Sequence, residues 1–180
     1  MPTYIEENEN QQEREKHPAG MANAVCLWIE DIGRHKGEWK GKEKIQRKLL
    51  FFWETSKKQA DGKPFIISKK YTASMYESAQ LRADLAAWNG GDFTEAELKR
   101  FDVDMFLGRP CLLNFVHTTD GKYSNIASIT PLMDGMAPLV PVNKEKPEWL
   151  TKWVAKLRAA SMDAGSENQA PPHDDSELPF

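Results

Sequence analysis

Five extended segments interrupted once by helical periodicity are the feature that most constrains how this sequence can fold. Three of them precede the helical part and two follow it. Within each segment apolar residues either alternate with polar ones or form a short continuous run, as in half-buried and fully buried strands. The expected strands span residues 22–32, 42–55, 65–72, 111–118 and 123–130. This order predicts a mainly β domain with helices inserted after the third strand.

Turn and helix signals separate these segments. The stretch 33–41 is expected to break the chain as a loop, and the dipeptides Asp61-Gly62 and Asp120-Gly121 are typical of hairpin turns. Capping-box spacing predicts helix starts at two places. The two pairs with this spacing are Ser74 with Glu77 and Thr94 with Glu97.

A Pro-rich stretch then leads to a further helix, which is expected to run from Pro147 to about residue 160. Its large apolar residues fall on one face. They are Trp149, Leu150, Trp153, Val154 and Leu157. We expect this face to pack on the domain or on another subunit, in which case the protein would be a homo-oligomer.

Three strands, a helical insert and two strands follow the element order of the oligonucleotide/oligosaccharide-binding (OB) barrel. We expect an OB-like five-stranded barrel in residues 19–132, with an open five-stranded sheet of the same order as the alternative. Residues 133–160 are expected to form the Pro-rich connector and amphipathic helix. The polar ends, residues 1–18 and 161–180, are expected to be a disordered arm and a disordered acidic tail.

Charge is distributed unevenly along the chain. Residues 1–20 hold five acidic and two basic residues, and residues 161–180 hold five acidic residues and neither Lys nor Arg. Because the whole chain carries −3, residues 21–160 carry +5. A basic body with an acidic tail suits a nucleic-acid-binding protein whose tail stays off the polyanion or competes weakly with it.

Several classes of protein are disfavoured because the sequence lacks their characteristic features. It has no run of 18 apolar residues and no basic region followed by an apolar stretch near Met1, so we expect neither membrane insertion nor secretion, and a cytoplasmic location. Cys26 and Cys111 have no CxxC partner. They are expected to be small core residues in a reducing compartment, and no cofactor is expected.

The segment from Arg34 to Lys48 has the chemistry needed to hold a single strand, because Lys and Arg surround a tryptophan. Trp39 has no apolar neighbours and is expected to be exposed for base stacking, with Tyr71 as a second stacking ring. The predicted nucleic-acid-binding residues are Arg34, Lys36, Trp39, Lys40, Lys42, Lys44, Arg47, Lys48, Lys69, Lys70 and Tyr71. The alternative is a solvated Lys-rich edge that discourages strand pairing, with Trp39 folded onto the barrel rim.

The last residues offer a partner protein a terminal benzyl ring and an α-carboxylate behind a run of acidic groups. The predicted partner-binding residues are Asp174, Asp175, Glu177, Leu178, Pro179 and Phe180. A solvated acidic tail that aids solubility is the alternative.

This ending resembles the acidic tip of bacterial single-stranded DNA-binding proteins, which typically end in several aspartates followed by Ile-Pro-Phe. About seven of the 180 residues carry the resemblance, and Ser176, Glu177 and Leu178 differ from the commonest form. In that family an OB barrel holds DNA and the tip recruits replication and repair enzymes. The body aligns with no stretch of the bacterial housekeeping protein. Its segments 71–88 and 108–123 resemble small phage-encoded DNA-binding proteins, and this resemblance implies a phage- or prophage-encoded protein.

An enzymatic function is not favoured. Several acidic residues and one histidine could in principle gather a divalent metal for nuclease chemistry, but their spacing matches no motif. These residues are Glu95, Glu97, Asp102, Asp104 and His117.

The sequence therefore predicts a non-enzymatic protein that coats single-stranded DNA and recruits replication, recombination or repair proteins through its tip. The first alternative is a decoy that occupies host repair enzymes through the same tip without binding DNA. A strand-annealing protein, which would need a large oligomer, is the second.

Overall fold

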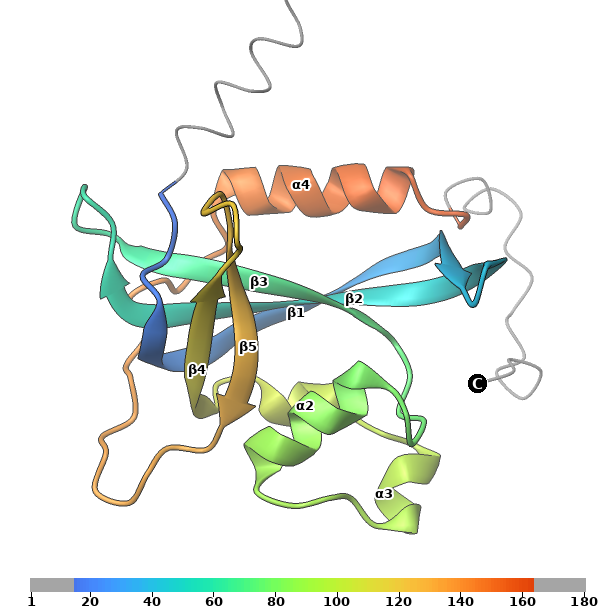
Figure 1. Cartoon of the computed structure of the whole chain (residues 1–180), viewed down its shortest axis with the longest axis horizontal. Coiled ribbons are helices and arrows are strands. Elements are labelled where there is room, and N and C mark those ends of the chain that lie inside the picture. The colour runs from blue at the N-terminus through green and yellow to red at the C-terminus, as the bar shows by residue number, and fades with distance from the viewer. Residues whose placement is uncertain (1–14, 164–180) are drawn as a thin grey trace, which may run out of the picture.

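The chain folds around one five-stranded antiparallel sheet (Figure 1). The structure is a computed structural model and describes residues 15–163. Its strands lie in the order β3-β2-β1-β4-β5. The elements are β1 (Gly20–Trp39), β2 (Lys42–Lys58), β3 (Pro64–Thr72), α2 (Gln80–Asn89), α3 (Glu95–Lys99), η1 (Val103–Phe106), β4 (Pro110–His117), β5 (Ser124–Thr130) and α4 (Glu148–Ala159). The expected mainly β fold, with helices after the third strand and one after the fifth, is confirmed.

β1 is the central strand and serves both halves of the sheet. Its first residues, 20–25, pair with β4, and residues 24–39 pair with β2. Register shifts after Cys26 and after Asp31 interrupt the ladder with β2. Such bulges bend a strand and increase its twist, so one strand can change partners along its length. The described strands do not close into a barrel, because β3 and β5 remain the two edges.

The stretch 33–41, expected to be a loop, is instead mostly strand. β1 runs to Trp39, and the chain reverses at Lys40 and Gly41, whose φ angles are 53° and 75°. Positive φ at both central residues gives a two-residue turn whose twist matches that of the strands. Gly33 lies in the second bulge of β1 with a φ of 80°, so it bends the strand without ending it.

The continued strands form a two-stranded ribbon that projects beyond the rest of the sheet (Figure 1). We call residues 34–47 the basic ribbon. Here β1 and β2 pair with each other only, in the register Arg34 with Arg47 through Trp39 with Lys42. Pairing of β2 with β3 begins just after it, at Lys48.

The main core lies on one face of the sheet, against α2, α3 and η1. It joins alternate residues of the strands to the apolar sides of these helices. Its largest fully buried members include Phe51, Trp53, Leu81, Leu85 and Phe106. Cys26 and Cys111 are free thiols in this core, which confirms their expected role as core residues. Burial raises the pKa of the Cys26 thiol to about 12.

The opposite face is covered in part by α4. Because β2 side chains alternate between faces, Leu50 and Phe52 point away from the main core and pack against Leu150 and Val154. The ring of Trp153 meets that of Phe52 edge-on, with centroids 5.9 Å apart. The expected packing of this helix on the domain is confirmed.

The connector to α4 is held by a buried carboxylate. Glu54 of β2 accepts hydrogen bonds from the backbone N–H groups of Val142 and Asn143, each at 2.9 Å. The side-chain amide of Asn143 donates a third, at 2.6 Å. A buried carboxylate needs such donors, so these contacts fix the chain just before α4 begins.

Residues 15–18, predicted to belong to a disordered arm, have defined contacts with the sheet. His17 is 2% exposed, stacks on Phe115 with ring centroids 3.7 Å apart, and is hydrogen-bonded to Thr55 at 2.8 Å. His17 is therefore a core residue. The sequence did not predict this, because the residues around it are polar.

One helix start was predicted correctly and one was not. Thr94 and Glu97 form a capping box at the start of α3. Ser74 does not begin α2, whose N-cap is Ala79, because its hydroxyl accepts the backbone N–H of Tyr76 in a turn. Serine stabilises turns through the same kind of local hydrogen bond that caps helices, so the spacing alone cannot separate the two.

Candidate nucleic-acid interface

The basic ribbon has two faces, and the predicted cationic residues divide between them. Residues directly opposite each other in an antiparallel pair share a face, and successive residues alternate. One face carries Arg34, Lys36 and Arg47. The other carries Lys42 and Lys44, and continues along β2 to Lys48.

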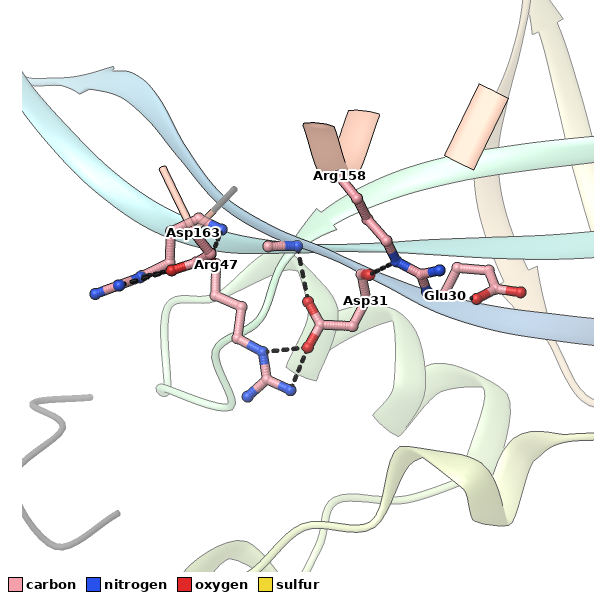
Figure 2. A network of polar contacts seen from close by, with 7 residues as sticks. Glu30, Asp31, Arg47, Arg158 and Asp163 are labelled. Atoms are coloured by element: carbon pink, nitrogen blue, oxygen red, sulfur yellow. Dashed lines mark hydrogen bonds and ion pairs between the residues drawn. The ribbon is translucent and has the colours of Figure 1, made fainter. Parts of the chain in front are cut away.

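Each cation on the first face has an acidic partner. Arg34 pairs with Asp163 at 2.6 Å, Lys36 with Glu43 at 3.3 Å, and Arg47 with Asp31 at 2.6 Å. Figure 2 shows Asp31 bound by the Arg47 guanidinium. Arg34 and Arg47 lie opposite each other, so these acids relieve their mutual repulsion. Exposed pairs of this kind contribute about 0–1 kcal/mol each, so a phosphate can compete for these cations.

The second face carries cations without acidic partners. We define the lysine face as Lys42, Lys44 and Lys48 of β2 with Lys70 of β3. Lys70 pairs in register with Leu50, which places it on the same side of the sheet as Lys48. Within residues 15–163, Lys42, Lys44 and Lys70 have neither an ion pair nor a side-chain hydrogen bond. Three exposed ammonium groups are therefore available to an anionic ligand here.

Lys48 stands where the basic ribbon joins the rest of the sheet. Its ammonium group donates to the Thr72 hydroxyl at 2.7 Å and to Gln46 at 3.3 Å. Partial burial and the neighbouring Lys70 lower the pKa of Lys48 from its ordinary value. A phosphate bound here would favour the charged form of Lys48.

Two predicted residues, Lys69 and Tyr71, face the opposite way. Tyr71 is 3% exposed, and its hydroxyl donates to Asp84 of α2 at 2.5 Å. Burial, with Asp84 beside it, raises the pKa of the Tyr71 hydroxyl above its ordinary value. Lys69 donates to the same carboxylate at 2.8 Å. The prediction of Tyr71 as an exposed stacking ring is wrong.

The cause of this error is the strand register. Tyr71 pairs with Leu49 and Lys69 with Phe51, so both side chains project toward the main core. Only the neighbouring Lys70 projects outward. Asp84, which satisfies both inward groups, lies 13 residues beyond Tyr71 on a helix, where the sequence gives no sign of this contact.

The remaining predicted residues belong to the turn and the tip. Lys40 occupies the hairpin turn and is exposed. The Trp39 backbone pairs with Lys42, but the Trp39 side chain lies outside the described part of the structure, so its exposure stays a prediction. Residues 174–180 also lie outside the described residues, and the partner-binding tip stays a prediction.

The sequence predicts that the α4 tryptophans pack on the domain or on another subunit. In the structure Trp149 and Trp153 remain 49% and 36% exposed after α4 has packed on the sheet. The helix carries five large apolar residues, which is more than one helix can bury against a single sheet. The number of these residues in the sequence therefore indicated that at least one tryptophan ring would stay exposed.

Two of the acidic residues weighed for metal chemistry, Glu97 and Asp102, have structural roles. Glu97 accepts hydrogen bonds from Thr94, which lower the pKa of the Glu97 carboxyl, and Asp102 accepts the backbone N–H of Asp104. His117 is hydrogen-bonded to the His17 carbonyl. In residues 15–163 no three His, Cys, Asp or Glu side chains gather as metal ligands. No helix among these residues is long and apolar enough to cross a bilayer.

No known protein family, curated protein sequence or solved structure matches the chain.

Proposed function

We propose that the protein is a non-enzymatic single-stranded DNA-binding protein. It coats single strands during replication, recombination or repair in the cytoplasm of a bacterial or phage-infected cell, and it recruits partner proteins through Phe180 and the acidic residues before it. The observation that carries the proposal is the lysine face, a row of cations without acidic partners that begins on a projecting ribbon.

The fold supports this assignment. An OB barrel would have the order β3-β2-β1-β4-β5 if the pairing between its third and fifth strands were absent. OB folds bind oligonucleotides through the face of strands 2 and 3 and through the connection between strands 1 and 2. Here that connection is the basic ribbon, and Lys70 lies on the third strand.

Single strands suit this surface better than duplexes. A flexible strand can follow a row of lysines on a twisted ribbon and can turn its bases toward aromatic rings. Duplex bases are already stacked and leave only the phosphates for contact.

A Lys42→Ala/Lys44→Ala double variant tests the proposal. Each lost phosphate contact should reduce the slope of log affinity against log salt by about 0.7, so the double variant should lose about 1.4. Fluorescence anisotropy of a labelled oligothymidylate at several salt concentrations measures both affinity and slope. Lys63→Ala/Lys99→Ala, which removes two exposed lysines away from the basic ribbon, is the matched control. Wild-type affinity and slope in the Lys42/Lys44 variant would contradict the proposal.

One observation favours a second candidate, the decoy that binds repair enzymes without binding DNA. Tyr71, expected to help hold DNA, is buried in the core. The two functions are separated by the same titration, since a decoy would bind neither single-stranded nor duplex DNA at physiological salt.

A further inference from the structure

One flank of α4 stays open to solvent and combines aromatic rings with cations. Leu150 and Val154 are buried against the sheet, whereas Trp149 and Trp153 keep 49% and 36% of their surface exposed. Spacings of four and three residues place Trp149, Trp153 and Lys156 on one stripe of the helix. Lys152 borders this stripe and is ion-paired to Glu148 at 3.0 Å.

The contacts of α4 show which way this stripe faces. Arg158 donates to the Asp31 carbonyl at 2.8 Å and to Glu30 at 2.9 Å, so its flank lies against β1 (Figure 2). Trp153 precedes Arg158 by five residues, which is about 140° around the helix. Trp153 meets Phe52 of β2. The tryptophan stripe therefore faces away from β1, toward the outer face of β3.

The outer face of β3 adds polar and cationic groups beside this stripe. Ser68 and Lys70 are paired in register with Phe52 and Leu50 and are exposed. Both therefore project on the side of the sheet that α4 covers in part. Lys70 belongs to the lysine face.

The C-terminal end of α4 reaches the base of the basic ribbon. The backbone N–H of Met162 donates to the Arg34 carbonyl at 2.8 Å, and Asp163 binds the Arg34 side chain. From Trp153, which lies over Phe52, the helix thus runs toward the ribbon. The tryptophan stripe, Lys70 and the lysine face consequently follow one another along the same side of the molecule.

We propose that the exposed flank of α4 is the base-stacking part of the single-stranded DNA site. Bases stack on Trp149 and Trp153 while Lys156 and Lys70 contact the phosphates. This inference rests on the proposed function, and it supplies the aromatic surface that Tyr71 cannot provide.

Charge favours DNA over a second copy of the chain as the occupant of this flank. A two-fold symmetric contact brings the same patch of both subunits together. Lys152 is already paired with Glu148, but Lys156 has no acidic partner within residues 15–163 and would be brought toward its own copy, whereas a polyanion complements it. Interleaved lysines and exposed rings are also the combination found in sequence-independent single-strand sites.

Trp149→Ala in the full-length protein is the direct test, because Trp149 is the more exposed ring and has no described ring contact. Loss of one stacked base should weaken binding of an oligothymidylate about five- to 150-fold, with the salt slope unchanged. Trp149→Phe, which keeps a ring, should recover most of the affinity. Lys156→Ala should instead lower the salt slope by about 0.7.

Tyr76→Ala is the matched control, since Tyr76 is an aromatic residue 65% exposed in the segment before α2. It should bind DNA as the wild type does. Trp153→Ala should also weaken binding, but it removes the contact with Phe52, so its thermal unfolding must be compared with that of the wild type.

The outcomes distinguish this inference from the function on which it rests. Wild-type affinity in Trp149→Ala, with weakened binding in the Lys42/Lys44 variant, would overturn the inference and leave the function standing. Failure of the wild type to bind single strands would overturn both. A dimer that Trp149→Ala converts to a monomer, seen by sedimentation, would make this flank an interface between copies and overturn the inference.

Discussion

His17 shows how a single side chain can set the response of the fold to pH. Burial lowers the pKa of the His17 imidazole from its ordinary value, and nearby Lys57 and His117 lower it further. The imidazole ring stacks on the ring of Phe115. In this buried position water would solvate a protonated imidazole poorly. The neutral imidazole is therefore the form that the fold accepts.

The pKa of His17 should make the protein less stable in mild acid. The unfolded chain takes up a proton near pH 6.5 while the folded chain resists it, so the contribution of His17 is fully present above about pH 6.5. It should be lost as the pH falls from there through the lower pKa of the folded state. Urea unfolding of the wild type and of His17→Phe at pH 7.5 and 5.5 measures this difference. The variant should lose less stability between the two values, and equal losses would contradict this account of His17.

At the scale of elements, contacts at both ends of α4 hold the helix in position. The connector before it is held by Glu54, and the residues after it pack on the bulge of β1. Glu30 of β1 joins these regions, because it binds both Lys146 and Arg158. The position of the exposed tryptophans thus depends on contacts at some distance from them.

Gly33 is where the end of α4 meets the basic ribbon, and an alanine there should loosen this junction. Its φ of 80° disfavours a side chain, and a Cβ atom would lie 2.8 Å from the Cβ of Ser161. Gly62→Ala is the matched control, because Gly62 has a φ of 85° and open space around it. Both variants should lose about 1–3 kcal/mol from backbone strain, and Gly33→Ala should lose more. Equal losses in urea unfolding would show that the Ser161 contact does not constrain the junction.

The elements differ in how far the sequence could predict them. Strands 42–55 and 65–72 were close to β2 and β3 because their apolar runs reflect burial on the sheet. The basic ribbon could not be recognised, since a glycine in a bulge and a glycine in a loop look alike in sequence. The inward direction of Tyr71 followed from the register with β2, which depends on tertiary pairing.

Across the whole molecule, the two faces of the sheet carry different kinds of residues. One face buries the main core, and the other carries the lysine face and α4. The cations of the candidate site were visible in the sequence because a run of lysines needs no tertiary information to be recognised. The stacking rings were not, since their exposure depends on how α4 packs.

The C-terminal tip should act independently of this surface. Burying the Phe180 ring contributes about 1.5–3 kcal/mol, and a charge-assisted contact to its carboxylate about as much again. Deleting Phe180 should therefore weaken the capture of a repair partner at least tenfold, by surface plasmon resonance. The affinity for DNA should stay unchanged or rise. Unaltered partner affinity would contradict the proposed role of the tip.

The central claim is that the protein binds single strands through both charge and stacking, and a titration of the full-length chain with single-stranded and duplex DNA tests it most directly. Tryptophan emission should be quenched by single strands, and duplex should bind much more weakly. With four phosphates held by the lysine face and a fifth by Lys156, the salt slope should be about −3.5, so a fourfold rise in salt should cost about 130-fold in affinity. Equal affinity for the two DNAs, or no quenching at saturation, would contradict the account.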